Sequence, residues 1–347
     1  MSEAEFGPGR PRGSRAGARL HIVTGKGGTG KTTVATALAL TLASRGGRVL
    51  LVEVEGRQGV ATLLGEPPLP YGERELIPVP GGGRVCVLAA DAESALLEYL
   101  ELFYGMRRAG QALNRLGAVD FATTIAPGLR DVLLTGKATE AVRRRAGTRR
   151  RSAAPASAPF HYDAVVMDAP PTGRIGRFLN VNTEVAGLAR VGPIRNHADK
   201  VMGVIRSPRT VVHFVTLLEE MPAQETRDGI AEIDALGLRV GSVVVNMVRP
   251  PLLEEADLTA AARGDLDGDE LVAGLKAAGL AGADDLAAAL AAEVRAHALR
   301  VGLERRTRER LADLGRPMVD LPYLEGGVDR SALEGLADTL AEQGMGR

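Results

Sequence analysis

Short apolar segments recur along the chain, and several are followed by longer segments with helical periodicity. The apolar segments lie at 19–25, 48–54, 84–90, 162–168, 209–218, 239–248 and 316–322, and the clearest helical patterns lie at 31–44, 222–236 and 331–343. A continuous apolar run of this length is typical of a strand that is buried on both faces of a parallel sheet. The alternation therefore predicts an α/β fold, with a doubly wound and mostly parallel sheet covered by helices on both faces.

Longer stretches interrupt this alternation. Residues 92–150 and 174–207 carry mainly helical patterns between predicted strands. We expect them to form a helical subdomain that is inserted into one domain spanning residues 19–347. A further stretch, 252–315, is first acidic and then rich in Ala, and it also has a helical pattern.

Two segments carry no pattern of regular structure. Residues 1–18 contain Gly, Pro and Arg without an apolar core, so we expect a disordered tail and no signal peptide. Residues 143–159 carry Arg and then Ala, Pro and Ser, which is typical of a flexible, solvated loop. The alternative for this loop is a docking site for an anionic partner or lipid.

Composition narrows the range of functions. Lys and Arg together number 43, as do Asp and Glu, so no overall basic bias indicates nucleic acid or an anionic membrane. Cys86 is the single cysteine, which excludes an internal disulfide and a multi-cysteine metal site built from one chain. No run approaches the ~18 apolar residues that a membrane-spanning helix needs. We therefore expect a cytoplasmic protein without a nucleic-acid partner.

One loop carries the strongest functional signal. Residues 24–33 read TGKGGTGKTT and contain the phosphate-binding pattern G-x-x-x-x-G-K-T after a predicted strand and before a predicted helix. Its glycines allow successive backbone N–H groups to point at an anion. We expect Lys31 to reach the β- and γ-phosphates, Thr32 to bind magnesium and Thr33 to donate toward the α-phosphate. The predicted nucleotide-binding residues of the loop are Gly25, Gly27, Gly28, Thr29, Gly30, Lys31, Thr32 and Thr33.

An aspartate ends another predicted strand, in the segment VVMDAPPTG at 165–173. In a parallel sheet the carboxyl end of this strand lies beside the phosphate-binding loop, so we expect Asp168 to hold the magnesium shell. The proline-rich segment 169–173 predicts a switch loop and not a helix. We expect the N–H of Gly173 to lie near the γ-phosphate.

Two glutamates, Glu53 and Glu55, leave the end of the strand at 48–54. We expect different roles for them: one supports the magnesium shell or the loop, and the other orients the attacking water. Phosphoryl transfer depends mainly on positioning and charge stabilisation, so a carboxylate that binds water is sufficient.

A later strand end carries an amide, Asn246, in the segment VVVNMV. An amide can pair with N6 and N7 of adenine. Guanine-specific sites usually place an aspartate three residues after such an asparagine, and Arg249 occupies that position here. We therefore expect ATP and not GTP as the ligand.

Several of these motifs resemble one known family. KGGTGKT with its extra lysine, Lys26, resembles the deviant Walker A of the SIMIBI class of P-loop NTPases, which includes MinD, ParA and the ArsA/GET ATPases. DAPPTGRIGRFL at 168–179 is similar to the switch II of the arsenite-pump and tail-anchored-protein targeting ATPases. VVVNMV at 243–248, VDLPYLEGGV at 319–328 and APGLRDVLLTGK at 126–137 resemble further segments of that family. The likeness extends from about residue 19 and is greatest to the actinobacterial ArsA/GET-like branch.

The resemblance implies a homodimer, or a heterodimer with a related ATPase chain, that closes face to face with ATP at the interface. It implies that Lys26 crosses to the partner's nucleotide and that Glu55 activates water, with Glu53 assigned to the magnesium shell. Pro322 and Tyr323 are implied to flank the adenine. Where related ATPases carry D-x-D this chain carries E-x-E, one methylene longer, so we expect low intrinsic turnover.

The chain also departs from the family. It has no C-x-x-C, so the zinc that joins the eukaryotic dimer is not expected, and one cysteine cannot supply a three-thiol arsenite site. A Met-rich insert that captures tail anchors is not visible either, since Met totals only 8.

The function predicted from the sequence is an ATP-hydrolysing dimeric switch, in which closure around ATP is coupled to a client, such as a membrane protein or a membrane complex. The apolar segment at 96–106 can line a client groove, although apolar helical stripes usually pack in a core. The alternative is a nucleotide-binding scaffold subunit that pairs with a related ATPase chain and hydrolyses little ATP.

Overall fold

The structure is a computed structural model that describes residues 17–54, 56, 58–104, 127–147, 155, 157–180 and 193–346, without the side chains of 102–104, 127 and 193–194. Several predictions fall outside these residues. They concern most of the tail at 1–18, positions 105–126 and 181–192 of the predicted insert segments, the catalytic assignment of Glu55, and positions 148–154 and 156 of the loop at 143–159.

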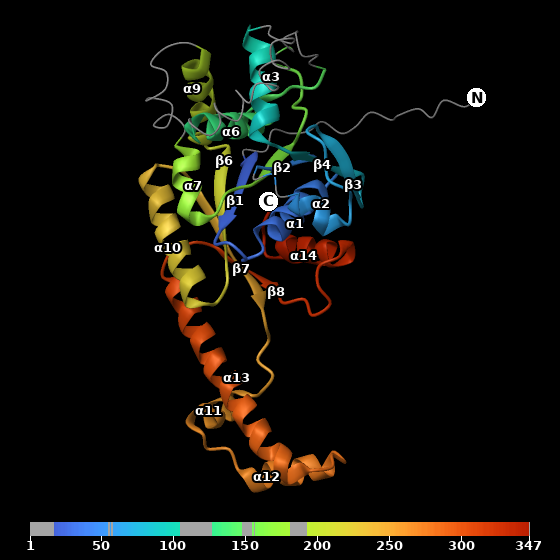
Figure 1. Ribbon diagram of the computed structural model, residues 1–347, viewed down its shortest axis with the longest axis vertical. Helices are drawn as coiled ribbons and strands as arrows, with labels where there is room; N and C mark the ends of the chain where they lie inside the picture. The colour runs from blue at the N-terminus through green and yellow to red at the C-terminus, as the bar shows by residue number, and fades with distance from the viewer. Residues whose placement is uncertain are drawn as a thin grey trace, which may run out of the picture.

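The described residues form one eight-stranded sheet in the order β3-β4-β2-β5-β1-β6-β7-β8 (Figure 1). The strands are β1 (Leu20–Gly25), β2 (Arg48–Glu53), β3 (Arg74–Val79), β4 (Gly83–Ala89), β5 (Ala164–Asp168), β6 (Thr210–Thr216), β7 (Val240–Val248) and β8 (Met318–Pro322). Neighbours are parallel except β3, which runs antiparallel to β4 at one edge. The mostly parallel, doubly wound fold is therefore confirmed. β3 was not expected, because its sequence RELIPV is short and only weakly apolar.

Each central strand supplies side chains to two separate cores, because successive residues of a strand face opposite sides of the sheet. On one side, α1 (Lys31–Ala43), α2 (Gly59–Leu64) and α14 (Arg330–Glu342) pack against residues such as Val49 and Leu51. On the other side, α6 (Pro127–Arg143), α7 (Thr172–Leu179), α9 (Pro193–Ile205) and α10 (Glu220–Ala235) pack against residues such as Leu50 and Val52. The sheet is thus covered on both faces.

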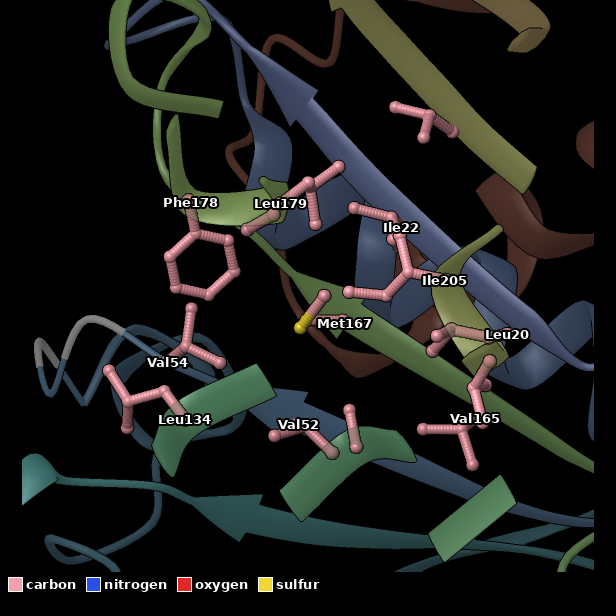
Figure 2. Packing of buried hydrophobic residues seen from close by; sticks show 14 of the residues in the cluster. Leu20, Ile22, Val52, Val54, Leu134, Val165, Met167, Phe178, Leu179 and Ile205 are labelled. Carbon is pink, nitrogen blue, oxygen red and sulfur yellow. The ribbon is translucent and has the colours of Figure 1, made fainter. Parts of the chain in front are cut away.

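The second of these cores fixes α7 on the sheet. Figure 2 shows Phe178 and Leu179 beside Ile22 of β1 and Met167 of β5, and all four side chains are almost completely buried. Burial of a large apolar side chain contributes about 1.5–3 kcal/mol relative to exposure. The helix α7, which follows Asp168 and the short segment 169–171, is therefore anchored by its own carboxyl-terminal residues.

Helices from both of the predicted insert segments lie together at one end of the sheet. α3 (Ala92–Tyr104) contacts α6, and α6 contacts α9 (Figure 1). Leu96 and Tyr99 of α3 pack with Leu133 of α6 in a small core of their own. The described part of the apolar segment at 96–106 is thus used for packing. Assignment of these helices to an inserted subdomain remains our proposal.

The stretch at 252–315 forms an arm that extends away from the sheet (Figure 1). It comprises α11 (Glu255–Arg263), α12 (Gly268–Ala277) and the 30-residue α13 (Ala283–Ala312), which is about 45 Å long at 1.5 Å per residue. Arg305 donates to both oxygens of Glu255, at 2.7 Å each, and this joins α11 to α13. The sequence predicted the helices but not their projection from the core.

Among the helices that the structure describes, none combines the length and the apolar character needed to cross a membrane.

A pair of buried histidines joins three central strands. His21 of β1 and His213 of β6 stack with their ring centroids 5.4 Å apart, and Nδ1 of His21 lies 3.2 Å from Nε2 of His213. Nδ1 of His213 accepts from the backbone N–H of Ser242, and Nε2 of His21 lies 3.3 Å from the Ala18 carbonyl oxygen. These contacts form a continuous donor-to-acceptor chain only when each ring is neutral and carries its proton on Nε2. Burial lowers the pKa of His21 to about 4 and that of His213 to about 3.

We predict that acidification destabilises the fold through this pair. The unfolded chain binds these protons near pH 6.5 and the folded chain does not, so stability is full above pH 6.5 and falls as the pH drops toward the lowered pKa values. Each buried histidine costs up to about 1.4 kcal/mol per pH unit in that window. Urea unfolding at pH 7 and pH 5 measures the loss, which is smaller in His213→Asn. A wild-type free energy of unfolding that is the same at both pH values contradicts the prediction.

Candidate nucleotide-binding site

The predicted site residues converge at the carboxyl ends of three neighbouring strands. β5 lies between β1 and β2, and its last residue, Asp168, pairs in register with Val23 of β1 and with Glu53 of β2. The phosphate-binding loop begins at Gly25, the last residue of β1, and leads into α1. Both carboxylates are buried, with Glu53 2% and Asp168 7% exposed. The parallel register therefore brings together residues that are 115 positions apart in the sequence.

The loop between β1 and α1 has the backbone of an anion-binding nest. Gly28 and Gly30 both have φ of 86°, a left-handed conformation that glycine adopts without strain. Gly30 also lies against Asn246, since an added Cβ would come within 2.3 Å of the Asn246 Nδ2. Gly27 and Gly28 are exposed and face open space. The loop thus presents bare backbone on the side where a phosphate can approach.

The amino terminus of α1 continues this surface. The first hydrogen bond of the helix joins the N–H of Val34 to the carbonyl of Gly30, so the N–H groups of Lys31, Thr32 and Thr33 precede the helical ladder. Such a terminus attracts anions through its N–H groups and the helix dipole. Inside the loop the Lys26 carbonyl accepts from the Thr29 hydroxyl at 2.9 Å and from the Lys31 Nζ at 3.2 Å. These bonds keep the loop closed and hold Lys31 over it.

The three residues predicted for the magnesium shell lie close to one another. The Thr32 hydroxyl donates to Oδ2 of Asp168 at 2.6 Å. Glu53 accepts from the N–H groups of Gly59 and Val60 at the start of α2, at 2.7 and 3.4 Å. A Cβ built on Gly59 would lie 3.4 Å from Oε1 of Glu53 and 3.5 Å from Oγ1 of Thr32. Glu53 therefore supports the following loop and also lies beside the other two residues.

This set fits a magnesium ion. Its donors are a hydroxyl and carboxylates, and Mg²⁺ takes oxygen ligands, often one or two from the protein with phosphate and water completing the shell. The described residues contain no cluster of three or more His, Cys, Asp or Glu that could hold a metal without such help. Thr32 and Asp168, with Glu53 beside them, are therefore the residues that could hold a magnesium ion.

The segment after Asp168 is partly helical, which corrects the prediction of a loop over 169–173. α7 begins at Thr172, so Gly173 lies in its first turn. Pro171 precedes the helix and Pro170 is held by the Thr24 hydroxyl, which donates to its carbonyl at 2.7 Å. A proline can stand immediately before a helix, because its fixed φ suits that position and a helix can begin at the next residue. The N–H of Gly173 is consequently one of the amino-terminal donors of α7.

Asn246 has a contact that the sequence did not indicate. Its side chain is 6% exposed, and Nδ2 donates to the carbonyl of Thr29 in the phosphate-binding loop at 2.9 Å. The amide of β7 thereby anchors that loop across β6. The expected pairing with adenine stays a prediction.

The residues predicted to flank the adenine lie close to Asn246. Pro322 ends β8 and pairs in register with Val248, and the Tyr323 N–H donates to the Val248 carbonyl at 2.9 Å. The guanidinium carbon of Arg249 lies 3.9 Å from the centroid of the Tyr323 ring. The ends of β7 and β8 thus bring these segments together, and the Arg249–Tyr323 contact was not foreseen.

Lys26 has a different environment from Lys31. Its Nζ lies 2.6 Å from Oε1 of Glu225 on α10, and Oε2 of Glu225 accepts from the Thr172 hydroxyl at 2.7 Å. The hydrogen bond from Lys26 and that from Thr172 lower the pKa of Glu225, so this carboxylate is ionised. Sequence reasoning missed Glu225, because it lies in the polar helical segment AQETRDG with no motif around it.

Comparison with known proteins agrees with this geometry. Residues 20–275 match the family described as CobQ/CobB/MinD/ParA nucleotide binding domain. The chain is 49% identical over 330 residues to ATPase BagA of Mycobacterium tuberculosis, covering 95% of this chain and 94% of that protein. It is 26% identical over 263 residues to the arsenical pump-driving ATPase of Escherichia coli (69% of this chain, 41% of that protein). It is also 26% identical over 191 residues to ATPase get3 of Schizosaccharomyces pombe (53% and 51%).

These matches confirm the family that the motifs resemble. The family match spans most of the sheet, including β1, β2, β5 and β7, and the mycobacterial ATPase matches nearly the whole length. The chain therefore belongs to the CobQ/CobB/MinD/ParA nucleotide-binding family, as an ATPase of the ArsA/Get3-like type.

Proposed function

We propose that the chain is an ATP-driven dimeric switch, which closes around Mg²⁺-ATP with a second copy or with a related ATPase chain. The observation that carries this proposal is the divergence of the two lysines of one loop. Lys31 lies over its own phosphate-binding loop, whereas Lys26 extends toward α10 and remains about one-third exposed. A lysine whose ammonium group does not bind its own loop can bind the phosphates of a nucleotide on a partner chain.

The other site residues of the same chain would bind the phosphates, the magnesium ion, the attacking water and the adenine. The N–H groups of the loop and Lys31 bind the phosphates, and the Gly173 N–H donates to the γ-phosphate. Thr32 and Asp168 would hold the magnesium ion with Glu53 beside them, and the bound ion would neutralise phosphate charge. Glu55 orients the attacking water. Asn246, Pro322 and Tyr323 form the adenine side.

A physical connection supports coupling to the helices α3, α6 and α9. α7 starts directly after the Asp168 loop, and Arg174 of α7 lies 3.7 Å from the largely buried Asp131 of α6. A rearrangement at residues 168–173 on ATP binding would move α7 and, with it, α6 and its neighbours. We propose that these helices engage a client, a membrane protein or a membrane complex, on the cytoplasmic side. The name of one relative, an arsenical pump-driving ATPase, agrees with coupling to a pump as the partner.

The switch predicts a specific defect for Lys26→Ala. The variant should bind ATP with near wild-type affinity, because Lys31 and the loop backbone remain. Its turnover should fall at least about a hundred-fold, as for loss of one preorganised charge-stabilising donor, and ATP-dependent association should weaken. Steady-state hydrolysis and sedimentation with and without ATP measure both effects. Lys276→Ala is the matched control, since Lys276 pairs with Asp284 on the distant arm. Wild-type turnover in Lys26→Ala would overturn the switch.

A scaffold subunit with little hydrolysis is the second candidate, favoured by the longer carboxylates of the E-x-E segment. Glu55→Gln separates the two functions, because glutamine keeps the shape of the side chain but is a much weaker base. A drop in turnover of about a hundred-fold or more supports the switch. A low rate that Glu55→Gln leaves unchanged supports the scaffold. Glu75→Gln, an exposed position on the edge strand β3, controls for loss of a surface charge.

A further inference from the structure

Glu225 of α10 connects two parts of the site that are distant in sequence. One of its carboxylate oxygens binds the Lys26 ammonium at 2.6 Å, and the other accepts from the hydroxyl of Thr172 at 2.7 Å. Lys26 belongs to the phosphate-binding loop, and Thr172 is the first residue of α7. One carboxylate thus holds the loop lysine and the start of the helix that follows Asp168.

The position of Glu225 is set by close packing between α7 and α10, which lie side by side in Figure 1. A Cβ on Gly229 of α10 would lie 2.7 Å from the Phe214 ring and 3.3 Å from the Thr172 methyl group. A Cβ on Gly176 of α7 would clash with the side chain of Glu232, two turns along α10 from Glu225. Residues 225, 229 and 232 share one face of a helix, because they are spaced by four and three. The same face that packs on α7 therefore presents Glu225 to Lys26.

The ion pair satisfies the charge of Lys26 within its own chain. A lysine held in this way must lose its carboxylate partner before it can bind phosphates elsewhere. Thr172 is bound by the other oxygen of the same carboxylate, so a rotation of Glu225 that frees Lys26 also releases the first residue of α7.

We propose that Glu225 is a positioning residue, which retains Lys26 in the nucleotide-free chain and releases it when ATP is bound between two chains. This inference rests on the proposed role of Lys26 in the partner's site. Glu225 thereby opposes closure without nucleotide and links release of Lys26 to movement of α7. Lys26 and Glu225 are each about one-third exposed, so the restraint is modest and amounts to roughly a two- to five-fold effect on an equilibrium constant.

Glu225→Gln tests the restraint, because glutamine keeps an acceptor for Thr172 and removes the charge that holds Lys26. We expect a two- to five-fold lower half-saturating concentration of a fluorescent ATP analogue, measured in the presence of Mg²⁺ at a chain concentration that permits association. Glu232→Gln is the matched control, since it alters the same face of α10 without touching Lys26, and it should leave this concentration unchanged. An unchanged or higher half-saturating concentration in Glu225→Gln overturns the proposal.

The same substitution in a Lys26→Ala background separates the restraint from simple repulsion between a carboxylate and phosphates. We expect Glu225→Gln to have no effect on analogue binding there, because the group that it releases is gone. An effect of the same size in both backgrounds overturns the proposal, since Glu225 would then act on the nucleotide and not through Lys26.

A measurement without nucleotide distinguishes failure of this proposal from failure of the proposed function. The chain has only five lysines, Lys26, Lys31, Lys137, Lys200 and Lys276, so labelling their ε-carbons with ¹³C yields a simple NMR spectrum. We expect Glu225→Gln to move the signal that is lost in Lys26→Ala, and Glu232→Gln to leave it in place. An unmoved Lys26 signal overturns the restraint. A wild-type chain that associates in the presence of ATP neither with itself nor with a related ATPase chain overturns the dimeric switch alone, and the Lys26 signal then still decides whether Glu225 holds it.

Discussion

The parallel register of β2, β5 and β1 is the constraint on which the site depends. Backbone hydrogen bonds hold Asp168 level with Glu53 on one side and with Val23 on the other. The loop that follows β1 can therefore place the Thr32 hydroxyl 2.6 Å from Asp168. A shift of β5 by one residue would turn Asp168 to the opposite face of the sheet, because side chains alternate along a strand. Such a shift would also exchange the side chains of β5 between the two cores, where close packing does not accommodate residues of a different size.

Glycines that let neighbouring segments pack closely position the other residues of the site. Gly30 lies against Asn246, whose amide holds the Thr29 carbonyl from a strand two positions away in the sheet. Gly176 and Gly229 allow α7 and α10 to approach, and this brings Glu225 to Lys26 and Thr172. The absence of a side chain at these glycines thus allows the neighbouring segments to approach closely enough for the polar side chains of the site to hydrogen-bond. The phosphate-binding loop is consequently supported from β7 on one side and from α10 on another.

The sequence supported the prediction of the fold well, because most of its strands are continuous apolar runs and longer helix-forming segments separate several of them. The bounds of α1, α10 and α14 differ from the predicted segments by at most two residues at either end. β3 and α2 were missed, since a short edge strand and a six-residue helix carry little periodicity. The boundary at Thr172 was placed incorrectly, because the two prolines before it were taken to exclude a helix that in fact begins after them.

The sequence by itself determined the family, the phosphate-binding loop and the two carboxylates beside it, Glu53 and Asp168, because these depend on residue types at fixed local spacing. The tertiary structure alone decided the second partners of those residues. The contact of Asn246 with Thr29, the pairing of Lys26 with Glu225 and the projection of α13 from the sheet all join or separate segments far apart in the chain. No local pattern specifies such contacts, because they arise from the packing of whole helices and strands against one another.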